Sequence, residues 1–403
     1  MNILVLTSVY KDLSMGARDT STNIVNSFVS DWIKQGHNVV VIHNSHCYPR
    51  LVHSIPASLK KKIATRISFS IADYDAVKEK KYMDSGATIY RIPIRKWIPH
   101  KTPSNKAIRK QINKILNILQ DNSFVPDVIT GHWASPQMEI ISELKKLYDC
   151  KTACVLHGTG YISDSSFDAK KYLQHIDHIG CRSISQARKV KEILSLNELP
   201  FVCYSGVPDI YLNNYEVSTE KYNNTSELVV SYVGRLVSYK NIDATIRALR
   251  SIQGLKWHFN IVGDGAEKKN LIELTKKLRC EENVKFWGKI PRDDVMNILK
   301  DTQVFIMIST NEIFGLVYLE AMAASCLTIA SKDGGVDGII VHGQNGFLCE
   351  EGNSVELEKI IKNHIMSEKI SKLQEIAENG YDTAIRYSDA KVAARYLETI
   401  LKD

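Results

Sequence analysis

The 403 residues are 44% hydrophobic and 24% charged, which excludes a disordered or fibrous chain and leaves room for two globular domains. No apolar run approaches the roughly 20 residues that span a bilayer, and residues 1–7 lack the basic start of a secretory signal, so we expect a cytoplasmic protein. The eight cysteines are scattered without the paired spacing of a metal site, and we expect them to be reduced core residues.

Strand patterns alternate with helical patterns along the chain, as in βαβ units. Helices are expected at residues 22–35, ended by Gly36, and at residues 105–120, whose pattern is amphipathic and basic. Residues 44–87 have no regular pattern and are expected to be irregular. The strands predicted in this half are residues 2–7, 38–43, 88–92, 127–130, 152–156 and 201–204. We therefore predict a Rossmann-like, acceptor-binding domain over residues 1–208.

Residues 209–226 are rich in Asn, Tyr, Thr and Ser and are typical of a linker. The βαβ pattern then restarts over residues 227–386, which we predict to be a second Rossmann-like domain. Its expected strands are residues 228–233, 258–262, 284–287, 304–308 and 327–330. The last helical pattern, within residues 387–403, is predicted to pack back on the first domain. The fold class is therefore α/β, with two doubly wound lobes and a cleft between them.

Positive charge is concentrated in residues 51–114, which hold 15 Lys and Arg against 4 Asp and Glu, although the whole chain carries a net charge of +7. Such a window indicates a surface that faces something anionic. Peripheral contact with an anionic membrane is the favoured interpretation, and a solvated face without a partner is the alternative. No nucleic-acid-binding motif accompanies the charge, so we expect no nucleic acid partner.

Two carboxylates flank the start of one predicted helix. Glu312 follows the buried strand at residues 304–308, and Glu320 lies on the helix that begins near Leu316. Ligands of open α/β sheets bind at the carboxyl ends of the strands. The helix N-terminus near Gly315 also offers free N–H groups that suit a phosphate. Carboxylates that accept hydroxyls, placed beside an anion site, suit a sugar nucleotide.

A second group of motifs follows other strands of the same half. Arg235 and Lys240, after Gly234, could together neutralise a diphosphate and stabilise it as a leaving group. Glycine turns at residues 263–265 and 334–335 could let backbone approach a ligand. Each of these motifs alone could equally be an ordinary surface loop or turn. Residues 261–265 are not a GxGxxG motif, so they give no support to NAD binding.

Two histidines end neighbouring strands of the first half. His157 ends the strand at residues 152–156 and is followed by Gly158, so it could bond a sugar hydroxyl or steady developing charge. His132 ends the preceding strand and could play a supporting role in acceptor binding. A purely structural histidine is the alternative at each position, and more so at His132.

In their order along the chain these motifs resemble the retaining glycosyltransferases of the GT-B fold, family 4 (group 1). The resemblance implies that Arg235 and Lys240 hold the donor diphosphate. It implies that Glu312 binds the transferred sugar and that Glu320 binds the ribose hydroxyls. The catalytic residues expected from the resemblance are Arg235, Lys240, Glu312 and His157. The other donor-binding positions that the resemblance implies are Gly16, Gly234, Gly263, Ile290, Phe314, Gly315 and Leu316. It also implies a reaction without metal or cofactor.

The sequence departs from the family pattern at four positions. Ile313 replaces a usual proline, Ala17 follows Gly16 where a second glycine is common, and Cys326 stands where glycine is common. Gly338 occupies a position that usually carries glutamate, which bears on the donor sugar more than on the reaction class.

The function we predict is transfer of a sugar from a nucleotide-diphosphate donor to a hydroxyl with retention, and the resemblance to the family favours UDP over GDP as the nucleotide. A glycan or polyprenyl-diphosphate-linked acceptor in bacterial cell-surface polysaccharide synthesis is expected. No residue stands out as a covalent nucleophile, which favours attack from the leaving-group face. The alternatives are a sugar-nucleotide 2-epimerase or phosphorylase of the same fold, and a sugar-nucleotide-binding protein without catalytic activity.

Overall fold

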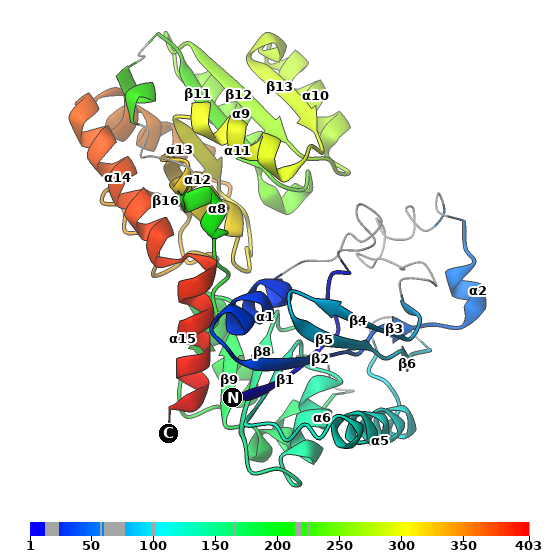
Figure 1. Ribbon diagram of the computed structural model, residues 1–403. Helices are drawn as coiled ribbons and strands as arrows, with labels where there is room; N and C mark the ends of the chain where they lie inside the picture. The colour runs from blue at the N-terminus through cyan, green and yellow to red at the C-terminus, as the bar shows by residue number, and fades with distance from the viewer. Residues whose placement is uncertain are drawn as a thin grey trace. The chain divides into compact units, whose positions relative to one another are not determined.

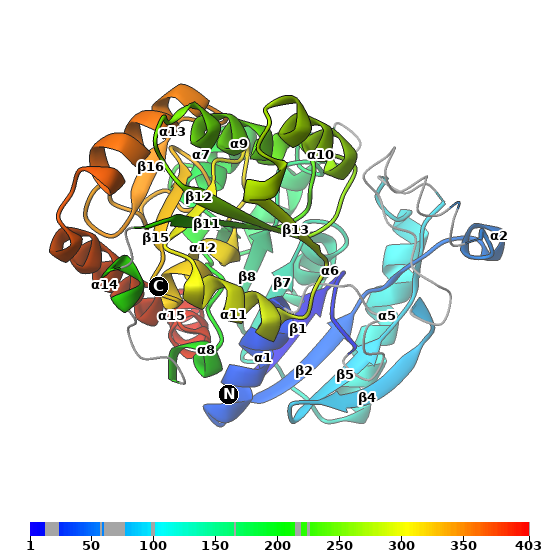
Figure 2. The same ribbon diagram turned by 90° about the horizontal axis from the view of Figure 1, so that it is seen from above.

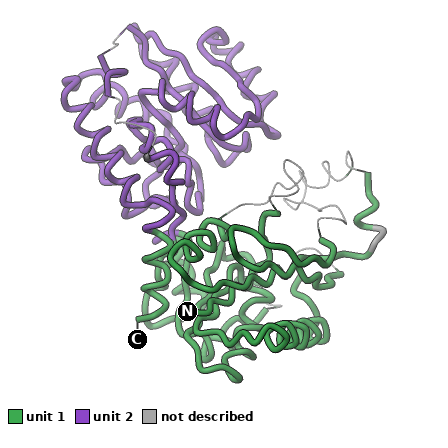
Figure 3. Tube along the Cα trace, viewed as in Figure 1, with its two compact units in different colours: residues 1–182, 186–203, 392–403 green, residues 183–185, 204–391 purple. Residues whose placement is uncertain are grey.

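The computed structural model describes residues 1–12, 24–56, 59, 77–97, 101–164, 167–213, 219–223 and 226–402 (Figures 1 and 2). It divides into two compact units (Figure 3). Unit 1 comprises residues 1–182, 186–203 and 392–403, and unit 2 comprises residues 183–185 and 204–391. Each unit is built on a mainly parallel sheet, so the predicted α/β class with two Rossmann-like lobes is confirmed.

The sheet of unit 1 has eight strands in the order β10-β9-β8-β7-β1-β2-β5-β4. Neighbouring strands are parallel except β4 and β5, which are antiparallel. The strands are β1 Asn2–Thr7, β2 Asn38–His43, β4 Lys80–Asp84, β5 Ala87–Arg91, β7 Val128–His132, β8 Lys151–Leu156, β9 His178–Cys181 and β10 Phe201–Val202. The chain runs from β1 to β2 on one side and later to β7 on the other. The carboxyl ends of the neighbouring strands β1 and β7 are therefore the position where ligands of such sheets usually bind.

Two strands of this sheet, β4 and β9, were not expected. Residues 80–84 fall in the stretch predicted to be irregular, and that prediction is wrong for them because they form β4. This segment has no apolar run, because it contains Lys80, Lys81 and Asp84. It can still form a strand at the edge of the sheet, where it has one neighbour and its side chains are at most half-buried. A two-stranded sheet of β3 (His46–Cys47) and β6 (Ile94–Arg95) adds a second regular feature to the basic region.

Helices with apolar stripes cover the sheet of unit 1. Helix α5 begins after Ser104, whose side chain caps the amide of Ala107, and it buries a stripe of isoleucine and leucine at helical spacing. The helices and turns are α1 Ile24–Lys34, α2 Arg50–His53, α5 Asn105–Asp121, α6 Gln137–Leu144, η2 Ala169–His175 and α7 Ile184–Leu194. Both chain ends lie in this unit (Figure 1).

The last helix, α15 (Asp389–Leu401), enters unit 1 at residue 392. There the indole nitrogen of Trp32 donates a hydrogen bond of 3.0 Å to the carbonyl oxygen of Ala393. The ring of Tyr396 lies 5.2 Å from that of Phe28, and its hydroxyl bonds to Thr130 in β7. These contacts bury one face of the helix against the first sheet.

The sheet of unit 2 has six parallel strands in the order β13-β12-β11-β14-β15-β16. The strands are β11 Leu228–Val233, β12 Trp257–Val262, β13 Val284–Gly288, β14 Val304–Met307, β15 Leu327–Ser331 and β16 Phe347–Cys349. Here β11 and β14 are neighbours, with Val230 opposite Val304. The direction of winding changes between them, so their carboxyl ends frame the second expected ligand position.

The helices of unit 2 include one that is apolar on nearly every side. Helix α12 buries six of its eight residues, because β15 covers one side and α14 another. The segment predicted as a linker holds a short helix and a turn, and its Tyr211 and Tyr222 are buried in the core of this unit. The helices and turns are α8 Asp209–Asn213, η3 Glu220–Asn223, η4 Ser238–Lys240, α9 Ile242–Ser251, α10 Lys268–Lys277, η5 Glu281–Asn283, α11 Arg292–Asp301, α12 Leu316–Ala323, α13 Ser354–Ile360, η6 Ile361–Met366 and α14 Ile370–Arg386. Across the described part of the chain, no helix combines the length and apolar character needed to cross a bilayer.

Candidate functional site

A pocket of about 680 Å³ opens in unit 2 where β11 and β14 end. The two strands are adjacent, so the loop after each one contributes to the same depression. The residues that line it are Val233, Gly234, Arg235, Tyr239, Lys240, Met307, Thr310, Asn311, Glu312, Ile313, Gly315 and Val317. The structure therefore brings together Arg235, Lys240 and Glu312, as the sequence predicted.

Lys240 and Glu312, which both line this pocket, form an ion pair. The turn η4 ends at Lys240 and directs its ammonium at Oε2 of Glu312, and the Sδ atom of Met307 lies 3.8 Å from the same nitrogen. Only 11% of the lysine side chain and 13% of the glutamate side chain are exposed. Two charges so deeply placed are tolerable because each neutralises the other. A bound anion could draw the lysine away and free the carboxylate to accept hydroxyls.

Arg235 supplies the remaining positive charge of the pocket. Its Nη2 atom donates a hydrogen bond of 2.8 Å to the hydroxyl of Tyr239, and its backbone carbonyl accepts one of 2.9 Å from Tyr232. No carboxylate in the described ranges forms an ion pair with this guanidinium. Most of its five N–H donors are thus available for the oxygens of an anion.

Glycines fix the position of both pocket loops. Gly263 has a φ of +133°, and a Cβ atom there would lie 1.8 Å from the carbonyl oxygen of Gly234. A Cβ atom on Gly335 would lie 2.4 Å from the carbonyl oxygen of Phe314. Neither Gly263 nor Gly335 lines the pocket. In this structure each lets a neighbouring loop approach closely, so their place is behind the site.

The helix α12 begins at the rim of the pocket. Gly315 precedes it with a φ of +78°, a conformation in which a residue with a side chain would be strained, and Leu316 is its first residue. Phe314 is buried and Ile313 is 39% exposed. The first N–H groups of α12 lie on the pocket side, next to Gly315 and Val317, where an anion would be stabilised.

Glu320 lies apart from the other three predicted side chains. It is 8% exposed, does not line the pocket, and forms an ion pair with Arg292, the first residue of α11. The guanidinium carbon of Arg292 also lies 5.4 Å from the ring centroid of Tyr211. The sequence reasoning missed Arg292. The sequence did offer a signal for it, because Arg292 lies two residues after Ile290, one of the predicted donor-binding positions. Ile290 is half-buried in the loop that follows β13.

In unit 1 the two predicted histidines are in contact. Their contact results from the parallel register of β7 and β8. His132 lies opposite Val155, which is two residues before His157. Nδ1 of His132 and Nε2 of His157 are 3.0 Å apart, and the ring of Trp133 stacks on His157 at 4.0 Å. Burial lowers the pKa of His132 to about 3, and burial together with Arg182 lowers the pKa of His157. Both rings are therefore neutral near pH 7, and the partly exposed His157 can offer a hydrogen bond but no charge.

A polar network extends from His132 to the first strand. Gln137, fully buried in α6, donates hydrogen bonds of 2.7 Å to the carbonyl oxygen of His132 and 3.0 Å to Oγ of Ser8. In the same helix, burial raises the pKa of Glu139 to about 7, although Ser135 donates a hydrogen bond of 2.7 Å to its carboxylate. Sequence reasoning did not identify these polar groups. Gly16, predicted to bind the donor, and Ala17 lie outside the described residues.

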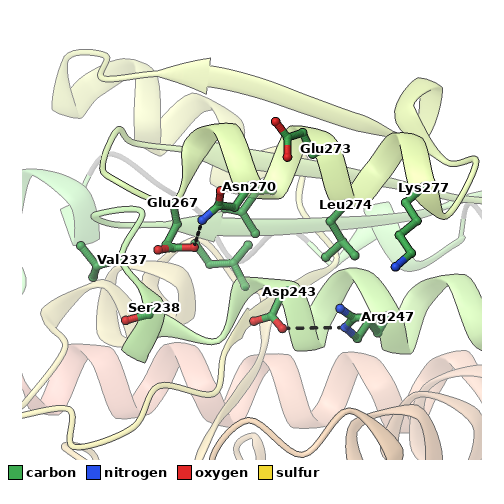
Figure 4. A pocket seen from close by; sticks show the side chains of 11 residues that line it. Val237, Ser238, Asp243, Arg247, Glu267, Asn270, Glu273, Leu274 and Lys277 are labelled. Atoms are coloured by element: carbon green, nitrogen blue, oxygen red, sulfur yellow. Dashed lines mark hydrogen bonds and ion pairs between the residues drawn. The ribbon is translucent and has the colours of Figure 1, made fainter.

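A second concavity of unit 2, of about 450 Å³, lies between α9 and α10 (Figure 4). Two contacts join side chains of its lining: Asp243 pairs with Arg247 at 3.8 Å, and Asn270 donates a hydrogen bond of 2.8 Å to Glu267. Acidic side chains are prominent in its lining, which suits a diphosphate poorly. The pocket between β11 and β14 is therefore the better candidate. Within the described ranges, His, Cys, Asp and Glu side chains form no group of three or more that could hold a metal ion.

Part of the chain matches a known protein family. Residues 216–383 match the family described as glycosyl transferases group 1. Over this stretch, which is 168 of the 403 residues, the chain is similar to the group 1 glycosyltransferases. An uncharacterized glycosyltransferase of Methanocaldococcus jannaschii is 26% identical over 80% of this chain and 86% of its own length. The N-acetyl-alpha-D-glucosaminyl L-malate synthase of Bacillus anthracis is 27% identical over 57% of this chain and 62% of its own length.

A solved structure of similar fold is Anabaena Alr3699/HepE in complex with UDP. The two superimpose with a TM-score of 0.66 at 19% identity, over 99% of each chain. At this level of identity the likeness concerns the fold. It confirms the GT-B architecture that the order of the motifs predicted.

Proposed function

We propose that this glycosyltransferase moves a sugar from a nucleotide-diphosphate donor, preferably a UDP-sugar, to an acceptor hydroxyl with retention at the anomeric carbon. The observation that carries the proposal is the single pocket that holds Arg235, Lys240 and Glu312. Its cations suit a diphosphate and its carboxylate suits sugar hydroxyls. The choice of UDP is supported by the UDP complex of the similar Anabaena fold.

The charges of the pocket suggest how the donor would be activated. Negative charge develops on the diphosphate as its bond to the sugar breaks, and Arg235 and Lys240 would stabilise that charge. Glu312, released by Lys240, would hold hydroxyls of the transferred sugar. In attack from the leaving-group face, the acceptor hydroxyl bonds to the anomeric carbon and its proton passes to a phosphate oxygen. We assign to His157 a neutral hydrogen bond to a sugar hydroxyl, in line with its lowered pKa.

Donor binding and reaction class can be tested together. A ligand at ~100 times its dissociation constant should stabilise the protein by ~2.7 kcal/mol, so a thermal-shift screen of UDP-, GDP- and ADP-sugars should reveal the donor. With that donor and an acceptor panel that includes glycans, polyprenyl-diphosphate sugars and L-malate, proton NMR should show the anomeric configuration of the donor in the product. Conversion of the donor sugar without release of nucleotide would instead indicate an epimerase. Binding without turnover across the panel would indicate a protein without catalytic activity.

We further propose that the basic segment brings unit 1 to an anionic membrane that carries a lipid-linked acceptor. Lys106, Arg109 and Lys110 are exposed on α5, and Trp97 is 72% exposed nearby in sequence. The cluster at residues 60–66 lies outside the described residues. Each basic residue near a membrane contributes ~1 kcal/mol, so replacing these three with Gln should weaken binding to anionic liposomes by up to ~100-fold.

A matched triple variant of unit 2 controls for the loss of charge. Lys269, Lys276 and Arg279 are exposed in or just after α10, so their replacement with Gln removes the same charge at another place. This control should bind liposomes as the wild type does. Equal binding by both triple variants would refute membrane contact through α5.

A further inference from the structure

Lys96 of unit 1 is a buried lysine whose charge is balanced by no carboxylate among the residues that the structure describes. It follows β6, is 2% exposed, and donates a hydrogen bond of 3.0 Å from Nζ to the hydroxyl of Tyr161. The same nitrogen lies 5.3 Å from the ring centroid of Tyr161. No ion pair joins Lys96 to any carboxylate within the described ranges. Buried ammonium groups are normally paired, because taking the charge out of water is costly.

The amine nevertheless remains mostly charged under ordinary conditions. Burial lowers its pKa to about 8, so near pH 7 the protonated form still predominates. A neighbouring ring reflects the same positive field, since burial and then the charge of Lys96 lower the pKa of His46 to about 3. One hydroxyl and one ring face satisfy only part of the three donors of an ammonium. An anion would supply the missing partner.

The position of Lys96 connects it to the ligand edge of the first sheet. His46 of β3 pairs with Ile94 of β6, two residues before Lys96, and its ring is close enough that, besides burial, the lysine charge lowers its pKa. Nε2 of His46 is 3.5 Å from Oγ of Ser8, the residue that follows β1. Ser8 in turn accepts a hydrogen bond from Gln137, which also bonds to the backbone of His132. His46, Ser8 and Tyr161 each keep part of their surface exposed, so this corner is not closed to solvent.

We propose that Lys96 and the hydroxyl of Tyr161 form an anion-binding subsite in unit 1 that holds a phosphate or carboxylate group of the acceptor. This inference rests on the proposed function, because it takes unit 1 to be the part that binds acceptor. It narrows the acceptor to an anionic molecule. The ammonium and the hydroxyl both donate to the bound oxygens, while the neutral His46 and Ser8 complete a polar wall.

Direct titration of the full chain tests the subsite. Isothermal titration is carried out with saturating UDP, which occupies the cationic pocket of unit 2, and with pyrophosphate, geranyl diphosphate or L-malate as the probe. The first two probes represent a diphosphate acceptor and the third represents a carboxylate acceptor. Lys96→Met should weaken binding of the preferred probe by about 10- to 100-fold, as expected for loss of a charge-assisted hydrogen bond. Tyr161→Phe should weaken it less, because the ammonium remains.

Lys101→Met is the matched control, since Lys101 lies five residues further along, is 53% exposed and pairs with Asp164 at 3.5 Å. It should bind every probe as the wild type does. Binding of no probe by the wild type, or equal binding by Lys96→Met, would overturn the subsite while leaving donor binding intact. Failure of UDP to bind would instead count against the proposed function. The same titrations would then use Lys240→Met without UDP, and an effect of Lys96→Met on the probes would still decide the subsite.

Discussion

Replacing Lys240 with methionine separates the stability of the pocket from its ability to bind a donor. The substitution keeps an unbranched apolar stem and removes the ammonium that neutralises Glu312. Removing one partner of a fully buried pair costs ~3–5 kcal/mol. Because the pair opens on a pocket and its side chains are 11% and 13% exposed, we expect about 2–3 kcal/mol here. For a unit of this size that corresponds to a fall of about 4–12 °C in Tm.

The double variant Lys240→Met/Glu312→Gln should recover most of this stability. Without the glutamate no buried charge is left unpaired, and a pair replaced by uncharged groups of similar size is often near neutral in stability. Donor affinity should not recover. Loss of a charge-assisted hydrogen bond to the diphosphate is worth ~1.5–3 kcal/mol, which corresponds to a Kd for UDP about 10- to 150-fold higher in both variants.

Differential scanning fluorimetry and isothermal titration with UDP measure the two effects. Lys332→Met provides the control, because Lys332 also pairs with a glutamate, Glu356, at 2.5 Å, but its side chain is 43% exposed and it does not line the pocket. That variant should lose less than ~1 kcal/mol and bind UDP normally. Normal UDP binding by Lys240→Met would refute our assignment of the lysine to the donor diphosphate. A double variant as unstable as the single one would refute the charge argument.

Three further substitutions test other parts of the structure. Gly263→Ala places a Cβ atom 1.8 Å from a backbone oxygen of Gly234, so it should abolish UDP binding and lower Tm far more than Gly254→Ala, whose site is open; equal Tm values would contradict this packing. Burial lowers the pKa of His132 to about 3, so below pH 6.5 this histidine takes up a proton in the unfolded chain but not in the folded protein. Each pH unit below 6.5 should therefore lower the free energy of unfolding by up to ~1.4 kcal/mol. Urea titrations should show a weaker dependence on pH for His132→Gln. Folding raises the pKa of Glu139 to about 7, so the ionised carboxylate lowers the stability of the folded protein fully above pH 7 and not at all below pH 4.5. Glu139→Gln should therefore stabilise the protein by about 3 kcal/mol at pH 8 and by little at pH 4.5. A stabilisation that does not depend on pH would argue against a titrating carboxyl group at this position.

Most strands of the two sheets could be predicted because a buried parallel strand appears in the sequence as a continuous apolar run. Residues 228–233 were predicted as a strand and form β11, and the run at residues 304–308 contains β14. The positions just beyond such strands follow directly, so Arg235 and Glu312 could be placed at the carboxyl edge of the sheet. Polar segments lack this signal. The edge strand at residues 80–84 is stabilised by one neighbour and shows no apolar run, so only the structure revealed it.

The pairing of Glu320 with Arg292 could not be derived from the sequence for a different reason. Helices α11 and α12 are joined through β14, and whether their side chains meet depends on how the helices pack on the sheet. Lys96 is a similar case, since a lysine in a basic segment reads as a solvated residue. It directly follows β6, which pairs with β3, and both of these strands have only two residues. Tertiary packing decided both positions, and neither local propensity nor charge pattern carries that information.

The pair of Lys240 and Glu312 also suggests why a site of this kind would favour a complete donor over a free nucleotide. A diphosphate that attracts Lys240 removes the partner of Glu312 and leaves a carboxylate with little solvent around it. Free nucleotide offers that carboxylate nothing in return, so part of the phosphate interaction is offset by the unpaired charge. A sugar attached to the diphosphate brings hydroxyls that can donate to Glu312 and restore its hydrogen bonds. Recognition of the phosphate and recognition of the sugar are thereby coupled through one ion pair, and departure of the sugar would weaken the hold on the remaining nucleotide.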